Sequence, residues 1–254
     1  MRRRSILAAG GLLWAADGPR DLRIFLLCGQ SNMAGRGDVA ESDRRSIERV
    51  WSMNKANDWA LATDPLHFDK PAIAGVGLGR TFARVLTSVD PDVRLGLVPC
   101  AFGGSALQEW APGTPHYENT LKRARIALSS GRLSGILWHQ GEADSADKQR
   151  AETYLERFSA MVAAFRKELG DVPIVVGQLG EFVPADKYPF AVTVNQTLAR
   201  VPLEVKRSAF VSSAGLAHRG DEIHFDSPGF REFGRRYAHA YLALDANWRL
   251  GEKA

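Results

Sequence analysis

Five short stretches of the chain are almost continuously apolar and rich in valine, isoleucine, leucine and phenylalanine. Each is too short for a helix, and none alternates as a strand with one face in water does. Uninterrupted apolar runs of this length are typical of parallel strands that are covered on both faces. We therefore predict five strands, at residues 22–28, 93–100, 135–139, 172–179 and 208–213.

Segments with helical spacing separate these strands. The clearest are residues 78–89 and 154–169, in which apolar side chains recur every three or four positions. Weaker examples lie at residues 117–128, 191–199 and 229–242. Strands that alternate with helices predict a three-layer α/β/α fold on a five-stranded parallel sheet. Residues 51–71 show neither pattern and are predicted to form a long irregular loop, of the kind that acts as a lid or a binding loop.

Length and composition are those of one domain. A chain of 254 residues, 45% hydrophobic and 24% charged, can bury a full core without splitting, so we expect a single domain over residues 17–254. The net charge is +4, but Arg2, Arg3 and Arg4 supply three positive charges and residues 1–16 contain no acid. The remainder carries only +1 and has no basic run interleaved with aromatics, so we expect no nucleic-acid partner.

Residues 1–16 resemble a signal peptide. Three arginines are followed by a short apolar stretch and by the small residues Ala15 and Ala16. The apolar stretch is shorter than the roughly 20 residues that cross a bilayer, and we predict no membrane span elsewhere. We expect export to a secreted or periplasmic location; the alternative is an N-terminal helix on the protein surface.

The two cysteines, Cys28 and Cys100, each end a predicted strand. Two cysteines in an exported protein can form a disulfide, but both positions suit small buried hydrophobic residues. We favour two buried thiols over a bridge.

Polar clusters stand at the ends of four predicted strands. Residues 29–32 follow the first strand, residues 101–105 follow the second, residues 138–142 end the third, and the fifth leads into residues 221–224. Ligands of open α/β sheets bind beyond the carboxyl ends of the strands. The four clusters are therefore expected to form one site.

Ser31 is the candidate nucleophile of this site. Its place between a buried strand and a helix start exposes its hydroxyl to an acyl carbon and its N–H to the resulting oxyanion. His224 is the candidate base, and Asp221 is close enough in sequence to orient its imidazole. Alone, the serine is more typical of a helix cap, and the Asp-x-x-His pair of a surface turn. Together they predict a serine esterase.

Further groups of the clusters have candidate roles. The N–H groups of Gly103 and Gly104 can approach a substrate closely, and the Gln140 amide is a third candidate oxyanion donor. The alternatives are an ordinary turn for the glycines and, for Gln140, hydrogen bonding within its own loop. Glu142 either orients His224 in place of Asp221 or holds the Gln140 loop.

Neither a metal nor a cofactor is predicted. His139, Glu142, Asp144 and His224 can be drawn as a ligand set, but their spacing matches no metal motif. The glycines of residues 75–79 do not fit the dinucleotide fingerprint, and residues 101–105 lack the lysine of a P-loop.

The motifs occur together and in a fixed order. They are Gly29-Gln30-Ser31-Asn32-Met33, the glycine pair followed by Trp110, Trp138-His139-Gln140-Gly141-Glu142, and Asp221-x-x-His224. In this combination the chain closely resembles the SGNH hydrolase superfamily, and within it the sialate O-acetylesterase-like branch that includes carbohydrate esterase family six, the acetyl xylan esterases. The resemblance covers roughly residues 22–243. It departs from the wider superfamily where Gln140 replaces an asparagine.

This resemblance implies a flavodoxin-like fold and metal-free hydrolysis of sugar acetyl esters through an acetyl-enzyme. By position, Ser31 is the nucleophile, His224 the base and Asp221 its partner, with the N–H groups of Ser31 and Gly104 as oxyanion donors. Glu142 remains a rival or a supplement to Asp221.

The expected partner is an acetylated carbohydrate, and no obligate protein partner is inferred. Trp59 and Trp110 offer possible stacking faces for a sugar, although large aromatics are more often core residues. The alternative functions are an acyl hydrolase for non-sugar esters, such as a lipase or thioesterase, and a non-catalytic carbohydrate-binding domain.

Overall fold

The structure is a computed structural model that describes residues 18–245. The predicted signal peptide, residues 1–16, lies outside these residues. Between residues 18 and 245, no helix has both the length and the apolar character to cross a membrane.

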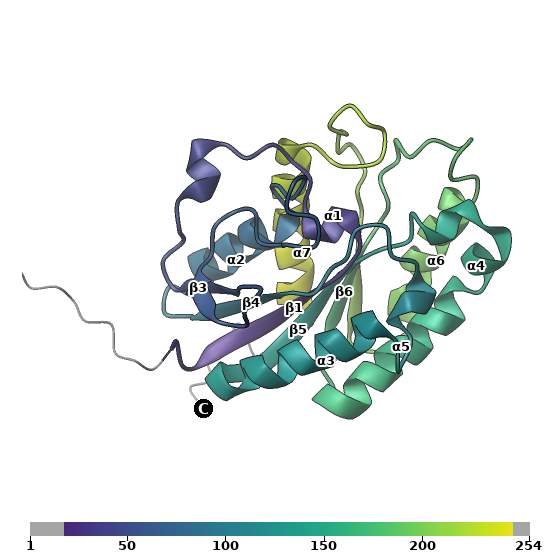
Figure 1. The fold of residues 1–254 in the computed structure, drawn as a ribbon. Helices are drawn as coiled ribbons and strands as arrows, with labels where there is room; N and C mark the ends of the chain where they lie inside the picture. Colours follow the sequence, from purple (N-terminus) through teal and green to yellow (C-terminus); the bar gives the residue numbers. More distant parts are fainter. Residues whose placement is uncertain (1–17, 246–254) are drawn as a thin grey trace, which may run out of the picture.

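A seven-stranded sheet forms the middle layer of an α/β/α arrangement (Figure 1). Its order is β3-β2-β4-β1-β5-β6-β7, and all strands are parallel except β3, which pairs antiparallel with β2 at one edge. The strands are β1 (Leu22–Gly29), β2 (Val50–Met53), β3 (Trp59–Leu61), β4 (Leu95–Pro99), β5 (Gly131–His139), β6 (Ile174–Gly177) and β7 (Ser208–Val211).

The predicted count of five strands is too low by two. The five predicted strands are present as β1, β4, β5, β6 and β7. β3, and β2 apart from Val50, lie in the segment predicted to be irregular. β2 has four residues and β3 has three, of which two are exposed, so neither produces a long apolar run. A turn at residues 54–58 joins them, closed by the Asn54 N–H donating to Asp58 O at 2.8 Å.

Helices cover both faces of the sheet. α2 and α7 pack on one face, and α3, α5 and α6 pack on the other (Figure 1). The helices are α1 (Ser31–Ala34), α2 (Leu78–Val89), α3 (Pro115–Ala127), α4 (Lys148–Glu152), α5 (Tyr154–Leu169), α6 (Ala191–Glu204) and α7 (Ser227–Leu244). The two helices with the clearest spacing, α2 and α5, have the predicted bounds.

The central strand β1 is buried from both sides because its side chains alternate between the faces. Ile24 and Leu26 belong to the core with α3, α5 and α6, whereas Phe25 and Leu27 belong to the core with α2 and α7. All four are 0% exposed, which explains why the strand reads as an unbroken apolar run. Cys28 and Cys100 are free and buried, as predicted.

The last pair of β1 and β5 places two of the polar clusters side by side. Gly29 pairs with His139, and a Cβ on Gly29 would lie 2.0 Å from the His139 carbonyl oxygen. With its φ of 126°, the position requires glycine. The close approach brings Ser31 next to the loop of Gln140 and Glu142.

Candidate active site

Ser31 is the first residue of α1, and only Gln30 separates it from the end of β1. The N–H groups of Met33 and Ala34 donate to Gln30 O, while those of Ser31 and Asn32 belong to the helix start, where no intrahelical acceptor exists. The side chain does not cap the helix. It is 6% exposed and meets His224 instead.

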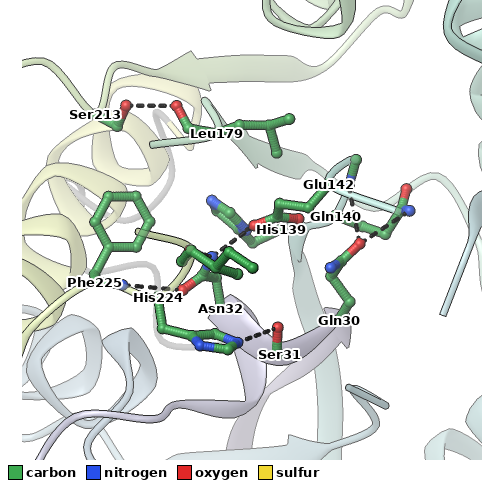
Figure 2. Close-up of polar contacts among 12 residues, drawn as sticks. Gln30, Ser31, Asn32, His139, Gln140, Glu142, Leu179, Ser213, His224 and Phe225 are labelled. Carbon is green, nitrogen blue, oxygen red and sulfur yellow. Dashed lines mark hydrogen bonds and ion pairs between the residues drawn. The ribbon is translucent and has the colours of Figure 1, made fainter. Parts of the chain in front are cut away.

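Ser31, His224 and Asp221 form a hydrogen-bonded chain. Ser31 Oγ lies 2.9 Å from His224 Nε2, although 193 positions separate the two residues in sequence (Figure 2). His224 Nδ1 lies 2.7 Å from Asp221 Oδ2. With the Nδ1 proton on the Asp221 side, Nε2 is the acceptor for the serine hydroxyl.

The Asp221 carboxylate is shaped by its own turn. Asp221 Oδ1 accepts the backbone N–H groups of His224 at 2.8 Å and Ile223 at 3.1 Å. Partial burial alone raises the pKa of Asp221, but the hydrogen bonds from the His224 backbone, the His224 ring and Ile223 outweigh it and the net pKa is lowered. The carboxylate therefore stays ionised beside the imidazole.

Glu142 does not stand behind His224, which corrects its prediction as an alternative acid. Both ring nitrogens of His224 are already engaged by Asp221 and Ser31. Glu142 is 1% exposed, and its Oε1 accepts the Asn32 amide at 2.6 Å (Figure 2). It supports the site through Asn32, the residue after Ser31.

Asn32 joins the nucleophile loop to the histidine loop. Its Nδ2 donates to Glu142 Oε1 and, at 2.9 Å, to Ile223 O, while its Oδ1 accepts the Phe225 N–H at 3.3 Å. Residues 223 and 225 flank His224, so one buried amide fixes the backbone on both sides of the base.

Gln140 is not an oxyanion donor in this geometry. The side chain is 0% exposed, and its Nε2 lies within 2.7–3.2 Å of Asp144 Oδ2, Ser105 O and Gln30 Oε1. An amide nitrogen has two hydrogens, so three internal acceptors leave none for a substrate. Its Oε1 accepts the Tyr154 hydroxyl at 2.8 Å. The side chain instead holds its own loop against residues 101–105, the candidate oxyanion loop.

Of the two glycines, Gly104 keeps a free donor. The Gly103 N–H donates to Asp69 Oδ2 at 2.8 Å, which removes it from the candidate donors. Gly104 has a φ of 88°, and its N–H has no acceptor among residues 18–245. The predicted donors that remain are the N–H groups of Ser31 and Gly104.

The carboxylate that accepts the Gly103 N–H belongs to a buried ion pair. Asp69 Oδ2 lies 2.6 Å from Arg36 NH2, and the two side chains are 1% and 2% exposed. Burial raises the pKa of Asp69, but Arg36 and the Gly103 N–H more than offset that effect and lower it. The ionised carboxylate therefore fixes the loop that carries Gly104.

The predicted stacking residues Trp59 and Trp110 are not at the site surface. The Trp59 ring packs on Gly96 near the start of β4, whereas the site lies at the carboxyl ends of the strands. Its Nε1 donates to Ser130 Oγ at 3.0 Å. Trp110 is 0% exposed, and its Nε1 donates to Ser105 Oγ at 2.9 Å. Both are structural residues, so neither offers a face to a sugar.

Sequence reasoning missed three positioning residues. Gln30 Oε1 accepts the N–H groups of Gly141 and Ala143, both at 3.3 Å, which ties the nucleophile loop to the end of β5. Gln30 and Asn32 stand inside the Gly-Gln-Ser-Asn-Met motif, which is a usable signal. Asp69 has no such sequence signal, because its partners Arg36 and Gly103 are 33 and 34 positions away.

The arrangement supports nucleophilic attack on an acyl group. A serine hydroxyl, an oriented imidazole and two backbone N–H groups that have no acceptor among residues 18–245 lie at the carboxyl ends of the strands. Within the described part of the chain, no group of three or more His, Cys, Asp and Glu side chains is placed to hold a metal ion.

Comparisons with known proteins point to the same chemistry. The sequence model of a family described as carbohydrate esterase, sialic acid-specific acetylesterase, matches residues 21–243. A probable carbohydrate esterase of Arabidopsis thaliana is 31% identical over 247 residues, which cover 87% of this chain and 90% of the relative. A solved structure of an Arabidopsis thaliana protein covers 88% of this chain and 98% of its own, with a TM-score of 0.79 and 28% identity. The crystal structure of NanS shares the fold, with a TM-score of 0.73 and 21% identity over 90% of this chain and 98% of its own.

Proposed function

We propose that this chain, which belongs to the sialic acid-specific acetylesterase family of carbohydrate esterases, removes O-acetyl groups from sugars with Ser31 as its nucleophile. Membership of the family makes the chain a carboxylic ester hydrolase. The observation that carries the serine mechanism is the hydrogen-bonded chain from Ser31 through His224 to Asp221.

The reaction proceeds in two steps. Ser31 Oγ attacks the acetyl carbon while His224 Nε2 takes its proton, and the carbonyl oxygen becomes an oxyanion bound by the N–H groups of Ser31 and Gly104. When the oxyanion collapses, the bond to the sugar oxygen breaks and the proton on His224 passes to that oxygen. The products of this step are the free sugar hydroxyl and acetyl-Ser31.

Water then completes the cycle. His224 takes a proton from a water molecule, whose oxygen attacks the acetyl carbon of acetyl-Ser31 through the same oxyanion site. Collapse breaks the bond to Ser31 Oγ, which recovers the proton, and acetate leaves. In both steps Asp221 stabilises the imidazolium that forms.

The test is acetate release by the wild-type chain from O-acetylated sialic acid, from acetylated xylan and from esters with longer acyl chains. We expect the sugar acetates to be preferred, with the sialic acid ester first because of the family. Ser31→Ala and His224→Ala are expected to lower kcat at least about a thousandfold, since each removes a member of the nucleophilic pair. Ser88→Ala, on the exposed end of α2, is the matched control and keeps full activity.

Two results would contradict the proposal. A strong preference for long acyl chains would assign the site to lipids or thioesters. More than a few per cent of activity in folded Ser31→Ala would exclude Ser31 as the nucleophile.

A further inference from the structure

Phe102 presents an exposed aromatic ring beside the oxyanion loop. It is 42% exposed, and among the large hydrophobic side chains exposed in residues 18–245 it is the only aromatic one. It directly precedes the Gly103-Gly104 pair at the end of the second predicted strand. Isolated exposed hydrophobic residues are common, so its position and its support decide whether it has a role.

The backbone of Phe102 is firmly held. Its N–H donates to Gly29 O at 2.9 Å, and its carbonyl accepts the Ser105 N–H at 3.2 Å and the Ser105 hydroxyl at 2.9 Å. Gly29 lies two positions before Ser31. The backbone of Phe102 is therefore kept at a fixed place relative to Ser31 and to the Gly104 donor.

One face of the ring is backed by another aromatic. Phe102 stacks on His116, with ring centroids 4.8 Å apart and planes inclined by 29°. The ring centroid of His116 in turn lies 5.4 Å from that of the buried Trp110. Because His116 covers one face of the ring, a ligand can stack on Phe102 only from the opposite face.

Polar groups border this stack. Burial lowers the pKa of His116, and the nearby Glu109 opposes that shift without cancelling it. The imidazole is thus uncharged at neutral pH, with its Nε2 3.8 Å from Glu109 Oε1. The Glu109 side chain is 49% exposed. A flat apolar face with hydrogen-bonding groups around it matches a pyranose ring, whose C–H bonds form an apolar face inside a rim of hydroxyls.

We propose that Phe102, backed by His116, is the platform on which the pyranose ring of the acetylated substrate stacks. The inference rests on the proposed function and deepens it, because it assigns the sugar ring, and not only the acetyl group, a binding residue. It gives Phe102 the role that the sequence suggested for Trp59 and Trp110.

The test compares kcat/KM for the best O-acetylated sugar with kcat/KM for ethyl acetate, which has no ring to stack. The ratio of the two constants is measured for the wild type, Phe102→Leu, Phe102→Tyr and Ile126→Ala. We expect Phe102→Leu to lower the ratio about tenfold, mainly through the KM of the sugar, which is the size of a typical aromatic contact. Phe102→Tyr, which keeps an aromatic ring, is expected to retain most of the wild-type ratio. Ile126→Ala alters another exposed hydrophobic residue, on α3, and leaves the ratio unchanged.

Each other outcome overturns the platform. Equal losses on both substrates in Phe102→Leu mean that the ring only supports the oxyanion loop. An unchanged ratio, with the wild type active on the sugar acetate, refutes the platform and leaves the proposed function intact. A wild type that hydrolyses ethyl acetate but no sugar acetate refutes the proposed function and the platform with it.

Discussion

At the scale of single residues, the two acids that the sequence offered as partners of His224 have different tasks because their surroundings differ. Asp221 lies on a partly exposed turn and is stabilised as an anion by backbone N–H groups and the imidazole. Glu142 is buried, its Oε2 has no hydrogen-bond partner among residues 18–245, and its other oxygen accepts the Asn32 amide. In the proposed mechanism Asp221 stabilises the charge that forms on His224, whereas Glu142 holds the position of the loops.

The residue-scale prediction ranks these two acids. Asp221→Asn is expected to lower kcat by roughly 10³- to 10⁴-fold, because an amide at this position stabilises the wrong imidazole tautomer and no longer stabilises the imidazolium. Glu142→Gln is expected to lower kcat far less, because a glutamine oxygen can still accept from Asn32. Steady-state kinetics on the best acetylated sugar measures both. A larger loss in Glu142→Gln, with the fold intact by circular dichroism, would reverse the assignment.

The sequence identifies the candidate catalytic residues more readily than the residues that position them. Ser31 is recognisable because it follows a strand end, and Asp221 and His224 because they form a short motif in the loop after the last strand. The role of Gln140 depends on three acceptors from three different segments, and that of Trp110 on the hydroxyl of Ser105. Contacts of this kind follow from packing, which no local pattern records.

At the scale of elements, the oxyanion loop depends on the connection between β3 and α2. This segment has no regular strand or helix between residues 62 and 77, yet it carries Asp69 to Gly103 and buries Arg36 beside it. The segment therefore supports the site through Asp69, while its predicted role as a lid or a binding loop stays a prediction.

The element-scale prediction concerns this support. Asp69→Asn leaves the Arg36 charge buried without a counter-ion and is expected to lower the free energy of unfolding by about 3 kcal/mol. It is also expected to lower kcat about tenfold, because Gly104 loses its fixed place. Urea denaturation and steady-state kinetics measure the two effects. Asp38→Asn is the control, because its 3.4 Å pair with Arg219 has a carboxylate that is 91% exposed and contributes little. Unchanged kcat in folded Asp69→Asn would show that the loop does not need this anchor.

Long elements were predictable and short ones were not. α2 and α5 have enough residues for several repeats of the helical spacing, and β1 is covered on both faces. β3 has only Trp59 partly buried, because the edge of the sheet leaves its other two residues exposed. Its pairing is set by the hairpin with β2 and by the ring of Trp59 against Gly96.

At the scale of the whole molecule, a buried charged cluster connects segments that the sheet does not join. Asp43 accepts from Arg231 of α7 at 2.7 Å and lies 3.9 Å from Arg80 of α2. Asp64 is 4% exposed, and its Oδ1 has no hydrogen-bond partner in residues 18–245. Burial raises the pKa of Asp64 to about 7, in spite of the nearby Arg80.

This pKa predicts a specific dependence of stability on pH. The pKa of Asp64 is higher in the folded chain than its ordinary value of 3.8, so the folded state binds the proton more tightly than the unfolded state. The contribution of Asp64 to stability is therefore complete below pH 3.8 and is lost as the pH rises to about 7. Asp64→Asn keeps a neutral side chain at every pH. Relative to this variant, the wild type is expected to lose about 3 kcal/mol of unfolding free energy between about pH 5 and about pH 8.

The comparison with the variant is needed because other buried groups oppose this trend. Burial lowers the pKa of His67 to about 4, so its contribution is present above its ordinary pKa of 6.5 and is lost as the pH falls to about 4. The wild type and Asp64→Asn both contain His67. The difference between their free energies of unfolding, measured by urea denaturation at each pH, therefore removes the effect of His67. The exposed Asp92→Asn serves as the control for the loss of one surface carboxylate. If the difference between wild type and Asp64→Asn is the same at both pH values, the Asp64 carboxyl does not titrate in this range, and the charges of Arg80 and Arg231 already hold it ionised in the folded protein.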